Sequence, residues 1–319
     1  MADLMVEAEG LMKRFGSTQA LAGVDVTAHA GSILGVLGPN GAGKTTMLRI
    51  LTTLTHPDAG HARVAGHDVV REPGAVRRNI GVAAQDATLD ENLTGRQNLV
   101  MVGELSRMER KQARARADEL LRTLELTDAA DRILKGYSGG MRRRLDVAAS
   151  MMTRPPVLFL DEPTTGLDPT SRQRVWTAVR ALVADGVTVL LTTQYLDEAD
   201  RLADRIVVID HGRVVAEGTP AELKRVTDGA RLDVTLASPH PRAADALREI
   251  ADGPLRCGDD GRHISAPVRI VPGLVTRAVR ALDDAGIELE DVALHQPSLD
   301  DVFMRLTGGV RDMTPAVTR

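Results

Sequence analysis

The sequence is poor in cysteine and in aromatic residues. Cys257 is its single cysteine, and Phe, Trp and Tyr together make up 2% of the 319 residues. One cysteine excludes an intramolecular disulfide framework and is typical of a reducing compartment such as the cytoplasm. Because 43% of the residues are hydrophobic but few carry rings, the predicted core is built from aliphatic side chains.

The sequence also lacks a long apolar segment and a large excess of either charge. Apolar runs such as Val187–Leu191 and Ile206–Ile209 are far shorter than the roughly 18 residues of a membrane-spanning helix. The first residues include Asp3, Glu7 and Glu9, unlike the apolar core of a secretory signal. A net charge of -4 provides no basic field, so nucleic acid is not an expected partner. We expect a globular protein that does not cross a bilayer by itself.

The order of the predicted elements divides the chain into two domains. Residues 1–225 alternate short apolar strands with helices, which predicts an α/β fold with a largely parallel sheet. Within this part, residues from about 92 to 152 lack strand signals and are predicted to form a helical insertion. Residues 226–319 follow the order strand, helix, strand, strand, helix, strand, which predicts a small α+β domain of the ferredoxin-like type. A closing helix is expected from Ser298, which can cap it.

A glycine-rich loop lies between a predicted strand, residues 32–37, and a predicted helix, residues 46–51. It reads Gly38, Pro39, Asn40, Gly41, Ala42, Gly43, Lys44 and Thr45. Small residues let backbone N–H groups surround a phosphate at a helix N-terminus, where the dipole favours negative charge. Lys44 is then expected to contact the terminal phosphates, and the Thr45 hydroxyl to bind Mg²⁺. The loop predicts nucleotide binding but not the use that is made of the nucleotide.

A second candidate site follows the apolar segment 157–160, where Asp161 and Glu162 come in succession. A strand buried on both faces would present Asp161 rigidly to a metal ion, directly or through water. Glu162 would then orient or deprotonate the water that attacks the γ-phosphate. The pair therefore predicts hydrolysis of the bound nucleotide.

Ser138, Gly139 and Gly140 form a second possible anion cradle, because two glycines after a serine open a predicted helix. One nucleotide does not need two cradles from one subunit. The economical interpretation is that two copies of the domain face each other, each cradle closing on the partner's nucleotide. The guanidinium groups of residues 142–144 follow on the same helix, where they could contact phosphate, a partner surface or solvent.

Taken in this order, the motifs resemble those of the ATP-binding subunits of ABC transporters, and the resemblance extends from Met5 to Leu223. The resemblance implies a P-loop NTPase fold with antiparallel β and helical subdomains, ATP and Mg²⁺ as cofactors, and a homodimer. It also implies that the nucleotide is bound by the loop through Thr46, by Phe15, which would stack on the base, and by Gln85, Ser138, Gly139, Gly140 and Asp168. The metal ion would be bound by Thr45, Gln85 and Asp161. Catalysis would depend on Lys44, Glu162 and Gln194.

Gln194 is a departure from the family pattern, because most relatives have histidine at this switch position. A glutamine amide can donate to the γ-phosphate but cannot carry a proton or a charge. Tyr137 and Met141 likewise replace the commoner leucine and glutamine that flank the second cradle. We expect hydrolysis to continue without a histidine-like titration from position 194.

Gln194, the segment 137–144 and the segment 297–303 together resemble the daunorubicin/doxorubicin-resistance type of subunit. That resemblance implies a peripheral protein at the cytoplasmic face of the cell membrane, which drives a separately encoded multi-span permease and exports hydrophobic drugs, antibiotics or lipids. Residues after about 225 would be the accessory domain of this group. Two alternatives remain open from the residues: a soluble ATPase of the same type that acts on ribosomes or DNA, and a regulatory module that binds ATP without turnover.

Overall fold

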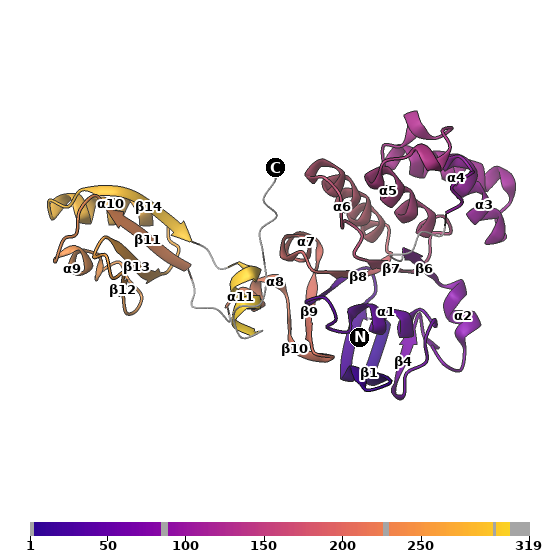
Figure 1. Ribbon diagram of the computed structural model, residues 1–319, viewed down its shortest axis with the longest axis horizontal. Coiled ribbons are helices and arrows are strands. Elements are labelled where there is room, and N and C mark those ends of the chain that lie inside the picture. The colour runs from indigo at the N-terminus through magenta and orange to yellow at the C-terminus, as the bar shows by residue number, and fades with distance from the viewer. Residues whose placement is uncertain (1–2, 84–88, 226–229, 296–297, 307–319) are drawn as a thin grey trace. The chain divides into compact units, whose positions relative to one another are not determined.

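The computed structural model of the chain describes residues 3–83, 89–225, 230–295 and 298–306 (Figure 1). The chain divides into two compact units, Met1–Pro220 and Ala221–Arg319, so the division precedes the predicted boundary at residue 225. Among the helices of the described residues, none combines the length and the apolar character that a bilayer crossing requires.

A six-stranded sheet forms the centre of the first unit. Its order is β10 (Arg213–Gly218), β9 (Arg205–Asp210), β3 (Ile33–Leu37), β8 (Thr188–Thr193), β7 (Val157–Asp161) and β6 (Ile80–Ala83). All neighbouring strands are parallel except β9 and β10, which are antiparallel. The α/β class predicted from the sequence is therefore confirmed.

The two faces of this sheet contribute to two separate hydrophobic cores. Strand residues alternate between faces, so Leu158 and Leu160 belong to one core while Val157 and Phe159 belong to the other. The first core is shared with α3 (Gly95–Leu105), α4 (Arg110–Thr123), α5 (Gly139–Ser150) and α6 (Pro169–Ala184), and the second with α1 (Lys44–Leu51) and a second sheet. Figure 1 shows these elements on opposite sides of the central sheet. Because β7 is buried on both faces, its carboxyl end is held rigidly.

The second sheet of the unit is antiparallel. Its order is β2 (Thr18–His29), β1 (Leu4–Phe15), β4 (Ala59–Val64) and β5 (His67–Asp68). The remaining helices of the unit are α2 (Pro73–Arg78) and α7 (Leu196–Leu202), with short 3₁₀ turns at Thr127–Ala129 and Leu134–Gly136. Helix α8 (Pro220–Arg225) begins at the last residue of this unit and continues into the second. The fold thus contains the antiparallel β part that the family resemblance implies.

The chain between β6 and β7 is helical, as the lack of strand signals predicts. Its described residues form α3, α4 and α5 and no named strand. Helix α3 begins at a capping box, in which the Thr94 side chain accepts from the Gln97 N–H and the Gln97 side chain accepts from the Thr94 N–H. Helix α4 buries Ala113, Ala117 and Leu120 at helical spacing, and its charged residues other than the buried Arg116 lie at more exposed positions.

The second unit has the predicted order of strands and helices. It comprises β11 (Ala230–Leu236), α9 (Ala243–Leu247), β12 (Arg256–Cys257), β13 (His263–Val268), α10 (Leu274–Asp284), β14 (Leu289–His295) and a closing helix α11 (Leu299–Leu306). The antiparallel sheet has the order β12-β13-β11-β14. Ser298 and Asp301 exchange hydrogen bonds at the start of α11, where Ser298 Oγ accepts from the Asp301 N–H at 3.2 Å and Asp301 Oδ2 accepts from the Ser298 N–H at 2.9 Å.

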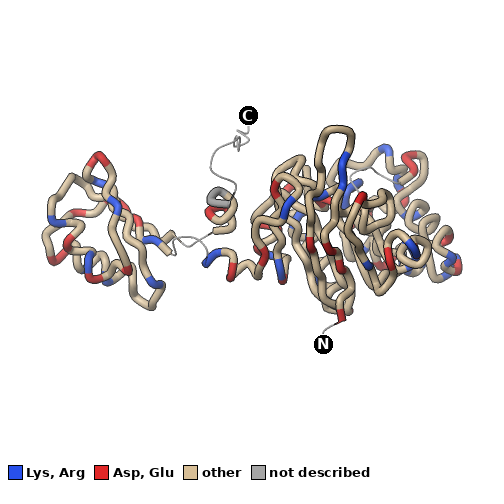
Figure 2. Tube along the Cα trace, turned by 90° about the horizontal axis from the view of Figure 1, so that it is seen from below, with Lys and Arg blue, Asp and Glu red and all other residues tan. Residues whose placement is uncertain are grey.

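Charged residues of both signs are interspersed along both units (Figure 2). Many are paired at the surface, as Arg96 is with Asp131 and Arg154 with Glu119. Exposed pairs of this kind stabilise a fold by less than about 1 kcal/mol each. Stability of the first unit therefore rests on its two aliphatic cores.

Candidate functional site

The predicted site residues follow three neighbouring strands at the carboxyl edge of the central sheet. Leu37, the last residue of β3, pairs with Thr193 at the end of β8, and Asp161 at the end of β7 pairs with Thr192. The glycine-rich loop, Gln194 and Glu162 come directly after these strand ends. Ligands of open α/β sheets bind at this edge, so the register brings the three segments to one place.

Two glycines of the loop are required by close packing of the backbone. A Cβ atom at Gly38 would lie 2.2 Å from the carbonyl oxygen of Ile209, and one at Gly43 would lie 2.5 Å from that of Ala20. Gly43 also has a φ of 111°, in the region that favours glycine. The loop is therefore held against β9 and β2 in a conformation that larger residues would disrupt.

Lys44 is the first residue of α1 and its side chain is buried. Its ammonium donates to the carbonyl oxygens of Gly38 at 2.7 Å and Pro39 at 3.0 Å, and it lies 3.8 Å from Glu162 Oε1. Burial lowers the pKa of Lys44, while Glu162 and Asp161 act in the opposite direction. The loop thus contains a partly desolvated cation at the point where terminal phosphates are expected.

Thr45 and Asp161 lie together beside the loop. The Thr45 hydroxyl is within 3.2 Å of Asp161 Oδ2, and the Thr192 hydroxyl donates to Asp161 Oδ1 at 2.5 Å. Mg²⁺ prefers oxygen ligands and is usually held by one or two protein groups together with phosphate and water. A hydroxyl and a single carboxylate fit that requirement, and the described residues contain no cluster of three or more His, Cys, Asp or Glu suited to another metal.

Glu162 has an uncommon backbone conformation. Its φ is 50°, in the left-handed region that non-glycine residues rarely adopt. The Glu162 N–H donates to both the carbonyl and the hydroxyl of Thr192 at 3.1 Å, and the Thr165 hydroxyl donates to Glu162 Oε2 at 3.2 Å. Such a conformation persists only where the surroundings impose it, so the direction of this carboxylate is determined by several hydrogen bonds.

Arg143 supplies further hydrogen bonds to the same turn. Its guanidinium donates to the carbonyl oxygens of Asp161, of Glu162 at 2.9 Å and of Pro163 at 3.2 Å. Sequence reasoning placed residues 142–144 on a helix but left their contacts open. Helical periodicity gave no signal for this contact, because it depends on the packing of α5 against the end of β7.

The neighbouring guanidinium groups have different partners. Arg142 forms an ion pair with Glu91 at 2.7 Å. Arg144 is buried and donates to the carbonyl oxygen of Leu124 at 2.8 Å. In this structure, all three arginines therefore contact groups of their own chain.

Ser138 and Asp168 each begin a helix. The Ser138 hydroxyl accepts from the Met141 N–H at 3.2 Å at the start of α5, and Asp168 Oδ1 accepts from the Ser171 N–H at 2.9 Å at the start of α6. A Cβ on Gly140 would be 3.4 Å from Leu167, so the two helix starts are close together. Within the described part of the chain, these hydrogen bonds join Ser138 and Asp168 to residues of the helices that they begin, Met141 and Ser171. Gly139 begins α5 beside them.

The two other predicted binding residues are Phe15 and Gln85. Phe15 ends β1 with 52% of its surface exposed, and the ammonium of Lys13 lies 5.5 Å from the centre of its ring. An exposed ring of this kind can stack on a base. Gln85 lies outside the described residues.

Asp146 is a buried carboxylate one turn beyond Arg143 on α5. It is 9% exposed, and its Oδ1 has no hydrogen-bond partner among the described residues. Burial raises the pKa of Asp146 to about 6, against the opposing effect of Arg143 and then Arg142. Its ionised form is therefore destabilised inside the fold.

Replacing Asp146 with Asn should make stability less dependent on pH. A carboxyl whose folded pKa exceeds its unfolded value stabilises the fold most at low pH, and this contribution falls as pH rises from about 4 through about 6. The difference of roughly two pKa units corresponds to at most about 3 kcal/mol. The thermal midpoint of Asp146→Asn should therefore rise relative to the parent by about 5 to 10 °C between pH 4.5 and 7. A difference between the two proteins that stays constant over this range would contradict the assignment.

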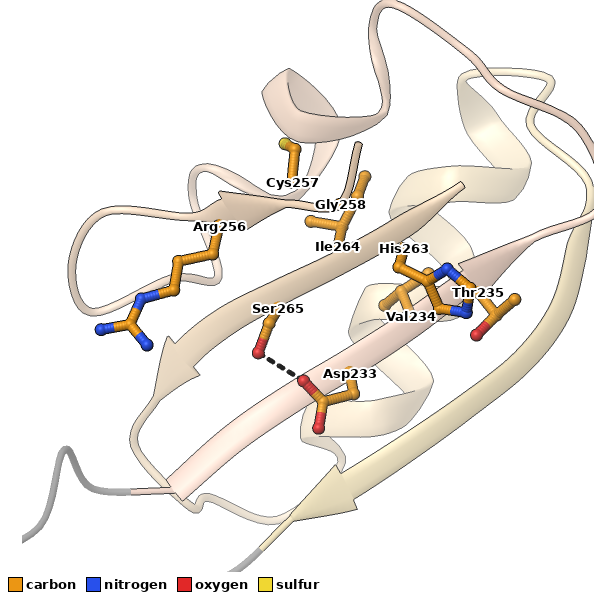
Figure 3. A pocket seen from close by; sticks show the side chains of 9 residues that line it. All are labelled: Asp233, Val234, Thr235, Arg256, Cys257, Gly258, His263, Ile264 and Ser265. Atoms are coloured by element: carbon orange, nitrogen blue, oxygen red, sulfur yellow. Dashed lines mark hydrogen bonds between the residues drawn. The ribbon is translucent and has the colours of Figure 1, made fainter. Parts of the chain in front are cut away.

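The second unit has a cavity of its own on the exposed face of the sheet, with a volume of about 320 Å³ (Figure 3). Its polar lining includes Asp233, Ser265 and His263. Ser265 Oγ accepts from Arg231 Nε at 2.7 Å and donates to Asp233 Oδ1, a hydrogen bond that Figure 3 shows across neighbouring strands. These contacts satisfy the polar groups within the sheet, and the residues belong to no site predicted from the sequence.

Comparison with known proteins gives sequence relatives over almost the whole chain. The family model described as ABC transporter matches residues 21–165. The daunorubicin resistance ATP-binding protein DrrA3 of Streptomyces coeruleorubidus is 55% identical, over 99% of this chain and 100% of its own length. The Nod factor export ATP-binding protein I of Ralstonia nicotianae is 38% identical, over 95% and 94%.

Solved structures resemble the first unit. One is the dimeric structure of a post-hydrolysis state of an ATP-binding cassette bound to ADP and Pi, with a TM-score of 0.63 and 27% identity, covering 67% of this chain and 98% of the other. A nucleotide-free ATP-binding cassette from an ABC transporter gives a TM-score of 0.64 and 26% identity, covering 70% and 95%. The resemblance thus extends over nearly all of each cassette.

Proposed function

The chain belongs to the ATP-binding subunits of ABC transporters, in the daunorubicin/doxorubicin-resistance group, and we propose that it powers a separate membrane permease that exports hydrophobic drugs or lipids. As a member of this family it binds ATP and is an ATPase. The observation that supports its activity most directly is the convergence of Lys44, Asp161 and Glu162 at one edge of the sheet.

The proposed roles follow from the contacts of the chain's own residues. The loop N–H groups surround the phosphates, and Lys44 exchanges its carbonyl partners for phosphate oxygens. Thr45 and Asp161, together with Gln85, would hold Mg²⁺, which neutralises charge between the phosphates when it is bound. Glu162 accepts a hydrogen bond from the attacking water and orients or deprotonates it, while Gln194 donates its amide to the γ-phosphate.

The proposed active assembly is a homodimer that binds ATP between the two chains. Ser138, Gly139 and Gly140 stand at the N-terminus of α5, where unpaired N–H groups favour an anion, while the phosphate loop of the same chain has its own helix N-terminus. Asp168 begins α6 close to them and would cross the interface. A dimer exists for the similar cassette bound to ADP and Pi, which supports the same arrangement here.

Export requires that the ATP-dependent closure of the dimer be transmitted to a membrane protein. The relatives are named for daunorubicin resistance and for Nod factor export, which supports a role in export of drug-like compounds. We place the chain at the cytoplasmic face of the cell membrane, peripheral to a multi-span permease, with residues 226–319 as an accessory domain. ATP binding acts as the ligand that favours one of two states of the complex.

Purification of the tagged chain from its native membrane tests this proposal. We expect a multi-span membrane protein to co-purify, and cells that lack the chain to retain more daunorubicin than the parent strain. An active ATPase that binds no membrane protein would instead support the soluble alternative, and a chain that binds ATP without turnover would support the regulatory module.

Replacing Gln194 with His should introduce a titration into the ATPase rate. The parent amide has no ionisable proton, whereas an imidazole changes charge at a pKa of about 6.5. We expect the pH profile of kcat for Gln194→His to gain an additional inflection near that pH relative to the parent. The matched control is Gln112→His at an exposed position on α4, and identical profiles for the parent and Gln194→His would contradict the role of residue 194.

A further inference from the structure

Arg143 holds the segment that carries the hydrolytic carboxylate. Its guanidinium donates to three successive carbonyl oxygens, those of Asp161, Glu162 and Pro163. A planar guanidinium presents several donors in a fixed arrangement, so it fixes the direction of this turn better than a single hydrogen bond could.

The turn needs such support because Glu162 adopts a φ of 50°. Relaxation toward an ordinary conformation would swing the side chain away from Lys44, which lies 3.8 Å from Glu162 Oε1. A displacement of about 1 Å at a reacting group can lower a rate by about 10²-fold. The conformation of the main chain at this residue is therefore part of the hydrolytic geometry.

Arg143 also connects this turn to the second cradle. Gly139 is the first residue of α5 and Ser138 is its N-cap, so Arg143 follows one turn later on the same helix. A helix is rigid over this distance. Any movement of the cradle relative to the central sheet must therefore move the guanidinium relative to the carbonyl oxygens of residues 161–163.

We propose that Arg143 is a positioning residue that couples the start of α5 to Glu162, with Asp146, one turn further along the same helix, as a carboxylate that favours the charge of its guanidinium. The inference rests on the proposed hydrolytic role of Glu162. Within one chain, Arg143 makes the position of Glu162 at the chain's own ATP site depend on Ser138, Gly139 and Gly140, which close on the partner's ATP. A hydrolytic site is then correctly arranged only when α5 is correctly placed.

Asp146 supports this assignment because residues three positions apart are neighbours on a helix surface. It is 9% exposed and lies one turn beyond Arg143, and burial opposes its ionisation while Arg143 favours it. The charges that act on Arg143 in turn are Asp146 on α5, Asp161 and Glu162 at the end of β7, and Glu198 on α7. Asp146 therefore favours the charged form of the buried Arg143 guanidinium.

The test compares Arg143→Met, Arg143→Lys and Asp146→Asn with the parent, in full-length protein with ATP and Mg²⁺. We expect Arg143→Met to lower kcat by at least about tenfold, with KM and the equilibrium affinity for ATP within about threefold of the parent. Arg143→Lys keeps a charge and hydrogen-bond donors and should recover part of kcat. Arg154→Met, which removes an exposed guanidinium paired with Glu119, is the matched control and should keep the parent rate.

Asp146→Asn decides the question even where Arg143→Met fails to fold. Its thermal midpoint at pH 7 should equal or exceed that of the parent. With such a midpoint, a fall of about threefold or more in kcat cannot result from unfolding. A parent-like kcat in Asp146→Asn and in any folded Arg143→Met would overturn the inference, as would equal losses of kcat and ATP affinity. Glu162→Gln is measured in the same experiment. If Glu162→Gln keeps the parent rate, the proposed hydrolytic role of Glu162 is refuted. If Glu162→Gln is inactive while the Arg143 and Asp146 variants are active, only the proposed coupling of α5 to Glu162 is refuted.

Discussion

Replacing Glu162 with Gln should lower the ATPase rate by about 10²- to 10⁴-fold, the usual contribution of a positioned general base, while ATP stays bound. The amide keeps the shape of the side chain and its contact with Thr165 but cannot accept a proton. Lys44, Thr45 and the loop remain intact, so affinity for ATP should change little. Single-turnover hydrolysis of radiolabelled ATP and equilibrium binding measure the two quantities separately.

The matched control for this experiment is Glu217→Gln. Glu217 is a carboxylate of β10 that pairs with Arg205 at the surface, and its loss should leave the rate within about twofold of the parent, because exposed pairs contribute little. Hydrolysis by Glu162→Gln at the parent rate would remove Glu162 from the mechanism. Loss of ATP binding in the same variant would mean that the carboxylate supports the loop rather than the chemistry.

Replacing Lys44 with Met should weaken ATP binding by about 30-fold or more. Lys44 is a buried cation inside the phosphate loop, and removing one partner of a buried, hydrogen-bonded charge pair costs about 2 to 5 kcal/mol, which is about 30-fold to several thousand-fold in affinity. Methionine retains most of the volume of the side chain. Equilibrium titration with a fluorescent ATP analogue gives the affinity, and the thermal midpoint without nucleotide shows whether the chain is folded.

Lys111→Met is the matched control for Lys44, since Lys111 is exposed on α4. Its affinity for ATP should equal that of the parent. A folded Lys44→Met protein that binds ATP with parent affinity would show that the ammonium does not contact the phosphates. The loop glycines alone would then account for binding.

Much of this site could be predicted from the sequence because its motifs are local. The phosphate loop needs small residues at Gly38 and Gly43, where any Cβ would meet a carbonyl oxygen, and this need appears directly as glycine in the sequence. The apolar run before Asp161 likewise shows a strand buried on both faces. Such features depend on a few consecutive residues and on one strand, loop and helix.

Other parts of the site could not be predicted because they depend on packing between distant segments. Thr192 donates to Asp161 from a neighbouring strand, and Arg143 reaches the end of β7 from α5. The φ of Glu162 follows from these contacts and not from the residue type. In the sequence alone, Arg143 is one of three successive arginines with no signal that separates it from the other two.

The second unit shows the same limit in another form. The alternating apolar residues Leu232, Val234 and Leu236 are typical of a half-buried strand, and the spacing of Leu274, Ala278 and Leu282 is typical of an amphipathic helix. These residues form the core of the unit. Its exposed sheet face carries polar groups such as Asp233 and Ser265 that bond to one another. The apolar pattern therefore predicts the fold of the second unit, but it does not predict which molecule would bind to the exposed face of its sheet.

The most direct test of the whole account is the molar mass of Glu162→Gln with ATP and Mg²⁺, measured by light scattering. We expect twice the chain mass of 34.2 kDa, because each ATP is bound between one chain's loop and the other's Ser138. Adding Ser138→Arg to the same chain should return the mass to 34.2 kDa while ATP remains bound to the intact loop. A single-chain mass for ATP-bound Glu162→Gln, or a doubled mass that does not respond to the change at Ser138, would contradict the shared site.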